Sequence, residues 1–355
     1  MIYNSFSSGI TPSISTITDK QFKVADSSPF EDTVSCLTWS QDENPNLLLC
    51  STWDGYVIIY KVISTDAEVS TVDRITLCDT TRFENPVLSV AWQNNLKRII
   101  AGSIDGSIFI RDPGGFAVGN LKIGQHDDAV KGVYSVEEIN AHVICSVSYD
   151  KTMKFWDIRS RGQISSFDLG AKAVCSDFLF PYVAIGLSNE KLLMFDIRYD
   201  IHDFRGDDRS YIDSPLGSNS SLSAISISKE SIVGIASCDG RSNLSKFERR
   251  NDGTIGLNNI VTFKAHKIDP GQNGNTSNLK ILYPIHAVGL HPLNRDTYFT
   301  AGGDGCVNFW DIPARNKLSF SLVQILRSLQ LNIALMENSW RMLMVMIGLR
   351  VLKDL

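Results

Sequence analysis

The chain has 355 residues, 43% of them apolar, and a formal net charge of −5 at pH 7. This length and composition allow a substantial buried core, while the negative charge excludes a globally basic nucleic-acid surface, so any RNA contact has to be local. The seven cysteines show no Cys-x-x-Cys spacing and no Cys/His cluster. That pattern argues against structural zinc and favours a reducing compartment.

The first residues of the chain, MIYNSFSSGITPSISTITDKQ, are rich in serine and threonine. They lack a basic start and a continuous apolar run, so they do not have the pattern of a signal peptide. We predict a disordered tail over residues 1–25, a folded domain over 26–320 and an apolar segment over 321–355. Charged residues interrupt that last segment, so no membrane insertion is expected.

One phrase recurs along the folded domain: an apolar run, a small residue, a tight turn such as Asp-Gly, and an alternating run that often ends in an aromatic residue. Its copies are LLLCSTWDGYVIIY, RIIAGSIDGSIFI, VICSVSYDKTMKFWD, VAIGLSNEKLLMFD, VGIASCDGRSNLSKF and YFTAGGDGCVNFWD. A drifting period of about 40–45 residues with a Trp-Asp ending is typical of the four-stranded blades of a β-propeller. We expect blades near residues 31–62, 83–113, 125–160, 163–199, 215–249 and 262–316.

Polar residues at fixed positions of these copies indicate a structural network. In the third copy, His126, Ser148, Asp150 and Trp156 are placed to form a buried hydrogen-bond chain between strands. The same structural role is expected for the turn aspartates and the last aromatic, namely Asp54, Asp105, Asp239, Asp304 and Trp310. These aspartates recur once per blade at one position, which favours structure over metal binding or acid catalysis.

Longer stretches resemble one family of propellers. They are DTVSCLTWSQDENPNLLLCSTWDG, GQHDDAVKGV, SYDKTMKFWDIRS, TFKAHK and YPIHAVGLHPLNRDTYFTAGGDGCVNFWD, together with the insertion HKIDPGQNGNTSNLKILYPIHAVGLHP. Over roughly residues 26–320 the chain is similar to the nuclear-pore mRNA export factors of the WD-repeat class. The mitotic spindle-checkpoint propeller, a sister family, is a poorer match.

The resemblance implies an all-β, seven-bladed, non-catalytic scaffold that is monomeric before it binds a partner. It implies a location in the nucleus, at the nuclear pore and in the cytoplasm. It also implies that a short acidic segment of an FG-repeat nucleoporin binds across one face of the propeller, and that single-stranded RNA contacts a basic patch. The alternatives are a spindle-checkpoint propeller that binds kinase segments and a substrate adaptor of a ubiquitin ligase complex.

The resemblance also implies which residues bind. Lys264 and Lys267 match basic positions that meet glutamates of the acidic segment, and Trp53 matches an exposed aromatic beside a turn. Each has a plainer interpretation, as a solvated charge or as an aromatic packed on its own hairpin. His266, between the two lysines, is interpreted as a buried blade histidine like His126. Candidate RNA contacts are Arg241, Lys246, Arg249 and Arg250, whose default interpretation is a solvated loop.

The sequence contains none of the common enzyme signatures. There is no Gly-x-Ser-x-Gly, no phosphate-binding loop, no His-Glu-x-x-His and no dinucleotide fingerprint. We therefore predict no enzymatic activity and no cofactor.

The ending, ENSWRMLMVMIGLRVLKDL, differs from the β pattern before it and occupies the place of a seventh blade. Its composition favours a helix over about 322–352, leaving the last blade incomplete or replaced. Codons that can encode this segment, read in another frame, yield YAYGYDWVKGFKGF, a phrase similar to the blade ending that the resemblance implies. We interpret residues from about 323 onward as the product of a shifted reading frame. A transcript that encodes this ending in frame would contradict that interpretation.

Overall fold

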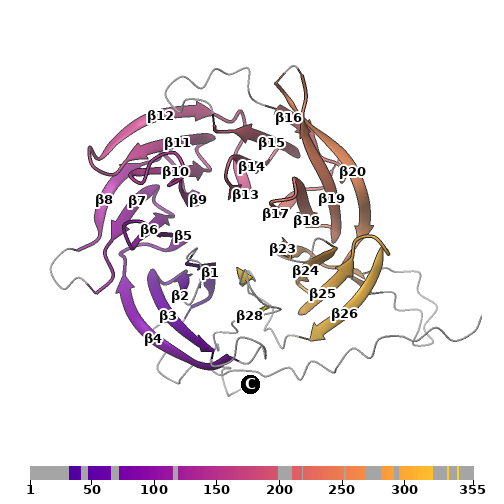
Figure 1. The fold of residues 1–355 in the computed structure, drawn as a ribbon, viewed down its shortest axis with the longest axis horizontal. Helices are drawn as coiled ribbons and strands as arrows, with labels where there is room; N and C mark the ends of the chain where they lie inside the picture. The colour runs from indigo at the N-terminus through magenta and orange to yellow at the C-terminus, as the bar shows by residue number, and fades with distance from the viewer. Residues whose placement is uncertain are drawn as a thin grey trace, which may run out of the picture.

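The computed structural model describes residues 32–40, 47–64, 72–114, 119–198, 210–217, 219–251, 253–268, 281–291, 296–322, 334–335 and 342–343. All the regular elements in these ranges are β-strands. Six four-stranded sheets are arranged as blades around a central axis (Figure 1). The structure is therefore an all-β propeller, as the repeats predicted.

The first three sheets are formed by β1–β4, β5–β8 and β9–β12. Their strands are β1 Val34–Trp39, β2 Leu47–Thr52, β3 Tyr56–Ser64, β4 Val72–Arg82, β5 Val87–Gln93, β6 Arg98–Ser103, β7 Ser107–Arg111, β8 Leu121–Gln125, β9 Val130–Ser135, β10 Val143–Ser148, β11 Thr152–Asp157 and β12 Gly162–Asp168.

The other three sheets are formed by β13–β16, β17–β20 and β23–β26. Their strands are β13 Ala173–Leu179, β14 Tyr182–Leu187, β15 Lys191–Asp196, β16 Ser210–Asp213, β17 Leu222–Ile227, β18 Ile232–Ser237, β19 Arg241–Arg249, β20 Ile255–Lys264, β23 Ile285–Leu290, β24 Thr297–Gly302, β25 Cys306–Asp311 and β26 Asn316–Leu322. Two short pairs lie outside the six sheets: β21 Lys267–Ile268 with β22 Ile281–Leu282, and β27 Ala334–Leu335 with β28 Met342–Leu343.

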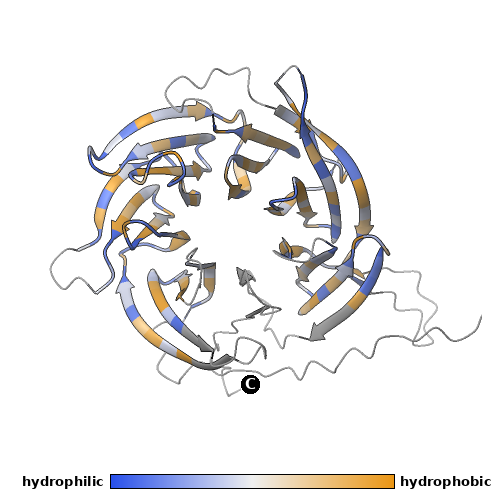
Figure 2. Cartoon of the chain, viewed as in Figure 1, coloured by the Kyte–Doolittle hydropathy of each residue, from blue (hydrophilic) through white to orange (hydrophobic). Residues whose placement is uncertain are grey.

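Every sheet is an antiparallel meander whose first strand lies nearest the axis (Figure 1). The second strands are the most deeply buried, and all six residues of β10 and of β24 are buried. For β10 the reason is that the third sheet has a neighbouring sheet on each side. The outer strands mix hydrophilic and hydrophobic residues along their length, as the colours of Figure 2 show, and β12 has a single buried residue among intermediate and exposed ones. This burial explains why apolar runs mark the second strands in the sequence.

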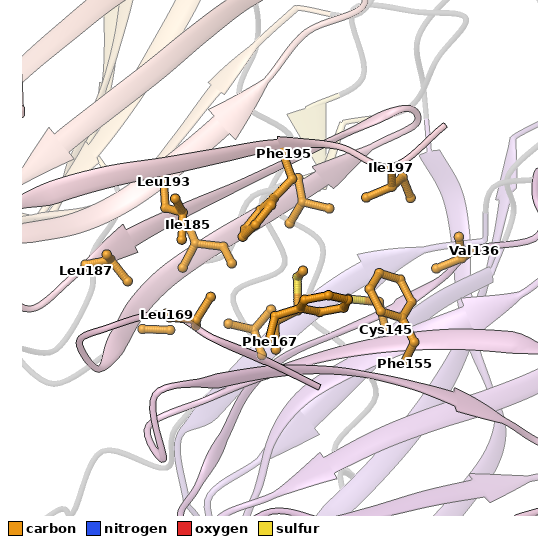
Figure 3. Close-up of a cluster of buried hydrophobic side chains, with 14 of the residues drawn as sticks. Val136, Cys145, Phe155, Phe167, Leu169, Ile185, Leu187, Leu193, Phe195 and Ile197 are labelled. Atoms are coloured by element: carbon orange, nitrogen blue, oxygen red, sulfur yellow. The ribbon is translucent and has the colours of Figure 1, made fainter. Parts of the chain in front are cut away.

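The core lies between neighbouring sheets. In the cluster between the third and fourth sheets, Phe155 and Phe167 meet edge to face with ring centroids 5.9 Å apart, and side chains such as Leu193 and Phe195 from the fourth sheet pack toward them (Figure 3). Polar contacts also join neighbouring sheets: the hydroxyls of Tyr134 and Ser176 lie 2.8 Å apart. Apolar packing and these contacts together fix the angle between blades.

The blade boundaries differ from the predicted ones. The strand that follows each aromatic ending stays in the same sheet as its outer strand, so β12, Gly162–Asp168, belongs to the third sheet and not to the fourth. The predicted fourth blade near 163–199 therefore starts one strand too early. The error arises because an exposed outer strand carries only a weak apolar pattern.

Two further expectations are not supported. The described residues form six blades and not seven, and within the range predicted as helix they form only the end of β26 and the pair β27–β28. The remainder of the predicted helix lies outside the described residues. For the seventh blade, the reason is that the sequence after β26 lacks the repeated turn that closes each blade hairpin. For the helix, the reason is that β27 pairs with β28 and lies against β1, so strand pairing overrides a weak helix preference at these residues.

Candidate functional site: the turn face of the propeller

The turns between the second and third strands of the six sheets lie on one face of the ring, which we call the turn face. It carries Asp54, Asp105, Asp150, Asn189, Asp239 and Asp304. The residue after each of these has a positive φ, from +66° at Glu190 to +85° at Gly55 and Gly106. Glycine adopts this conformation without strain, which explains the recurring Asp-Gly pairs.

The turn aspartates hold their own hairpins. The Asp150 carboxylate accepts the backbone N–H of Thr152 at 2.9 Å, and Asp105 accepts that of Ser107 at 3.0 Å. The hydroxyls of Thr52 and Ser237 donate to Asp54 and Asp239 respectively. These carboxylates are thus engaged locally, in the Asx pattern that stabilises tight turns.

A buried chain of hydrogen bonds lies beneath the third turn. The Trp156 indole N–H donates to Ser146 Oγ at 2.8 Å, and Ser146 Oγ lies 2.7 Å from His126 Nε2. On its other side, His126 Nδ1 lies 2.7 Å from the Asp150 carboxylate. The structure thus brings together His126, Asp150 and Trp156. The hydroxyl that links them is Ser146 and not Ser148, which instead donates to the Ala129 carbonyl at 2.9 Å.

The sixth sheet contains the same chain. Trp310 Nε1 donates to Thr300 Oγ1 at 3.0 Å, Thr300 Oγ1 lies 2.9 Å from His266 Nε2, and His266 Nδ1 lies 2.9 Å from Asp304. His266 is fully buried, so it is a structural histidine and not a surface ligand. Sequence reasoning missed Ser146 and Thr300. Both stand four residues before the turn aspartate, whereas the sequence pattern predicted the hydroxyl two residues before it as the linking group.

The electrostatics of the third chain keep its members in fixed protonation states. Burial lowers the pKa of His126 more than the Asp150 carboxylate raises it, so the imidazole is neutral. Burial by itself would raise the pKa of Asp150, but hydrogen bonds from Thr152 and His126 outweigh burial and hold this pKa below its ordinary value. A neutral histidine that donates through Nδ1 and accepts through Nε2 satisfies every member of the chain.

Trp53 stands directly before the first turn and is 36% exposed. Its backbone N–H donates to the Thr33 carbonyl at 2.9 Å, which fixes the residue on the turn face. Ile104 occupies the same position in the second sheet, where its N–H donates to the Pro86 carbonyl, and it is 37% exposed. Ile104 was not identified from the sequence, although its place one residue before a turn aspartate was the available signal.

Lys264 and Lys267 also lie on the turn face. Lys264 ends β20 opposite Arg241, the residue that follows the fifth turn, and Lys267 begins β21. Both lysines are exposed, whereas Ala265 and His266 between them are buried. The Ala265 N–H donates to the Gly240 carbonyl at 2.8 Å. The buried pair therefore anchors the segment and holds both lysines toward solvent.

The four candidate RNA residues are not brought into one patch. Arg241 begins β19 and Arg249 ends it, so they lie at opposite ends of a nine-residue strand, about 25 Å apart. Three of the four contact carboxylates. These ion pairs are Arg241 with Asp239 at 2.9 Å, Lys246 with Glu248 at 3.4 Å and Arg249 with Asp196 at 3.4 Å. Arg250 is exposed.

Within the described part of the chain, no group of three or more His, Cys, Asp or Glu side chains is arranged to hold a metal ion. A search of the same ranges for a helix long and apolar enough to cross a membrane finds none.

The repeated blades and the two buried Trp–hydroxyl–His–Asp chains define a WD-repeat β-propeller. The family model for the WD domain, G-beta repeat, matches residues 77–112. These residues comprise the last part of β4 and all of β5, β6 and β7. One sequence repeat thus spans two adjacent sheets and ties them together.

Relatives of known name extend over most of the chain. Protein Rae1 of Drosophila melanogaster is 28% identical over 317 residues, which cover 88% of this chain and 83% of the relative. The poly(A)+ RNA export protein of Schizosaccharomyces pombe is 26% identical over 316 residues, covering 88% and 81%. The spindle assembly checkpoint protein bub3 of the same yeast is 26% identical over 275 residues, covering 77% and 76%. The resemblance seen in the sequence is confirmed: the chain is a homologue of the WD-repeat mRNA export factors, and the checkpoint protein is a further homologue.

Proposed function

We propose that the chain is a non-catalytic WD-repeat scaffold in mRNA export that acts in the nucleus and at the nuclear pore. The names of two relatives, a poly(A)+ RNA export protein and an mRNA export factor, support the export role. The observation that carries the proposal is the position of Lys264 and Lys267, two exposed lysines held on the turn face by the buried residues between them. Of the turn aspartates, Asp105 and Asp150 accept backbone N–H groups of their own hairpins.

The partner we propose is a short acidic segment of an FG-repeat nucleoporin that lies across the turn face. Its carboxylates bind Lys264 and Lys267, and one of its apolar side chains packs on Trp53. A lysine ammonium lacks the two-pronged geometry of arginine, so its contribution is mainly that of a point charge. Binding should therefore weaken steeply as salt rises, since exposed charge pairs are screened.

The experiment is a binding titration of the full chain with an acidic nucleoporin segment. The double variant Lys264→Glu/Lys267→Glu should weaken binding by roughly 10–100-fold, because two attractions become repulsions. Lys229→Glu is the matched control: Lys229 is exposed in the turn between β17 and β18, on the opposite face. Equal affinities of the double variant and the control would remove the two lysines from the site.

A second candidate is a spindle-checkpoint propeller that binds kinase segments through the same face, and it is favoured by the similarity to the checkpoint protein. Titration with an acidic kinase segment separates the two candidates. Tighter binding of the kinase segment, with competition for the same lysines, would favour the checkpoint role.

Single-stranded RNA is only a minor ligand in this proposal, because three of its four candidate residues already contact carboxylates.

A further inference from the structure

The short pair β21–β22, which we call the ribbon, is tied to the turn face at its base. Tyr283 N–H donates to the His266 carbonyl at 3.1 Å and so continues the pairing of Lys267 with Leu282. A Cβ added at Gly240 would lie 2.8 Å from the carbonyl oxygens of both His266 and Tyr283, so the base of the ribbon packs directly on the fifth turn. The Pro284 carbonyl accepts the Gly303 N–H at 2.8 Å, which ties it to the sixth turn as well.

The ribbon exposes apolar side chains beside the lysines. Ile281 is 42% exposed and Leu282 is 38% exposed. Among the residues that the structure describes, these two are the only large exposed apolar residues that are adjacent in sequence. Contiguous apolar surface can mark an interaction site, and the useful feature here is the apolar surface of Leu282 next to the charge of Lys267.

The register of the ribbon places charge and apolar surface on one side. Lys267 and Leu282 are directly opposite each other, so their side chains project from the same side, with Cβ atoms about 5 Å apart. Lys264 adds a second exposed positive charge at the end of β20. Ile281, adjacent to Leu282, projects from the other side.

We infer that the ribbon is part of the partner-binding surface and that its occupant is an extended acidic segment in which a carboxylate and a large apolar residue stand two positions apart. This inference rests on the proposed function and specifies the partner's pattern. In an extended chain, residues i and i+2 face the same way at about 7 Å, which lets a carboxylate reach Lys267 while the apolar side chain covers Leu282. The positive charge selects an acidic partner, and the apolar surface disfavours a purely phosphate-bearing one.

The test is a titration of the full chain at low and high salt with two peptides of identical composition. In one, glutamate and leucine stand two positions apart; in the other, they are adjacent. Leu282→Ser should weaken binding of the first peptide about tenfold at both salt concentrations, because the lost contact is apolar. The first peptide should also bind more tightly than the second. Ile139→Ser is the matched control, since Ile139 is equally exposed at 38% but lies between β9 and β10, away from the turn face.

The outcomes separate the inference from the proposed function. If Lys264→Glu/Lys267→Glu abolishes binding while Leu282→Ser and Ile139→Ser both bind like wild type, the lysine site stands and the ribbon is not part of it. If neither these peptides nor the acidic nucleoporin segment binds at all, the proposed function fails together with the inference. Tight binding of oligouridine that Leu282→Ser leaves unchanged, without peptide binding, would assign the face to RNA and overturn both.

Discussion

The third and fourth sheets hold equivalent positions with opposite chemistry. His126 and Leu169 both follow an outer strand, and each donates its backbone N–H to the carbonyl of the second turn residue in the preceding sheet, at 2.9 Å and 2.7 Å. In the third sheet the side chains below are His126, Ser146 and Trp156; in the fourth they are Leu169, Ile185 and Phe195, all fully buried. The backbone bond is the same, but a polar chain in one sheet is replaced by apolar packing in the next.

This difference shows what the blade requires. The backbone contact fixes where the side chain lies, and the side chain then has to match its two neighbours. A full polar chain satisfies all its members, and a full apolar set fills the same space, whereas a mixture would leave a buried polar group without a partner. We therefore predict that the members of the polar chain, and likewise those of the apolar set, contribute to the free energy of unfolding as a unit and not independently.

The largest effect should come from opening the apolar set. Phe195→Ala removes a ring that packs among Leu169, Ile185 and other buried side chains (Figure 3), and should lower the free energy of unfolding by about 3–5 kcal/mol. Urea denaturation measures the change. The matched variant in the third sheet is Trp156→Phe, which keeps a ring and loses one hydrogen bond, at about 1 kcal/mol. Equal losses for the two variants would contradict the comparison.

The next effect comes from mixing the two sets. His126→Leu leaves the Asp150 carboxylate and the Ser146 hydroxyl without their histidine partner, and should cost about 2–4 kcal/mol. The triple variant His126→Leu/Ser146→Ile/Trp156→Phe should cost less than the sum of its three single changes, because it rebuilds an apolar set like that of the fourth sheet. A strictly additive triple variant would show that the chain is not a unit.

Lowering the pH should change the free energy of unfolding in opposite directions through the fourth sheet, which contains Asp177, and the third sheet, which contains His126. Burial raises the pKa of Asp177, in β13, to about 6, more than the backbone N–H groups of Ile227 and Phe178 lower it. Because this folded pKa lies above the ordinary value of 3.8, the folded state binds the proton first, and stability gains as pH falls from about 6 to 4. The lowered pKa of His126 has the reverse effect, since the unfolded state takes up that proton first below pH 6.5.

Asp177→Asn tests this sign. The amide oxygen can still accept the Ile227 N–H, which lies 2.7 Å from the carboxylate. As the pH falls from 7 to 4, the free energy of unfolding of the wild type should rise by on the order of 2 kcal/mol relative to that of the variant, measured by urea denaturation at each pH. Profiles that stay parallel over this range would show that the Asp177 carboxyl does not titrate near pH 6.

The contrast between the sheets also explains what the sequence could and could not predict. The turns and the apolar second strands were predictable, because positive φ and two-sided burial restrict the residues at those positions. His126, Asp150 and Trp156 were predictable because they stand at fixed positions of the repeated pattern. Ser146 was not, because a small hydroxyl residue inside an apolar run gives no sign of whether it packs or bonds.

Surface features were less predictable than the turns. The ribbon depends on pairing between Lys267 and Leu282 across an insertion, and no local pattern predicts such a contact. The four candidate RNA residues at 241–250 do not form one patch, because Arg241 and Arg249 lie at opposite ends of one extended strand. The helix expected after residue 322 rested on propensity alone, which tertiary pairing readily overrides.

The smallest predicted effect concerns the turns of the same two sheets, which lack the usual glycine. Lys151 and Glu190 have φ of +68° and +66°, a conformation that costs a residue with a Cβ about 1 kcal/mol. Lys151→Gly should therefore stabilise the chain by about 0.5–1 kcal/mol. Glu190→Gly should gain less, because the Glu190 carboxylate accepts the Asn219 N–H at 2.7 Å and glycine loses that bond. Thermal unfolding of both variants gives the order; a gain for Glu190→Gly at least as large as that for Lys151→Gly would show that the carboxylate contact does not stabilise the turn.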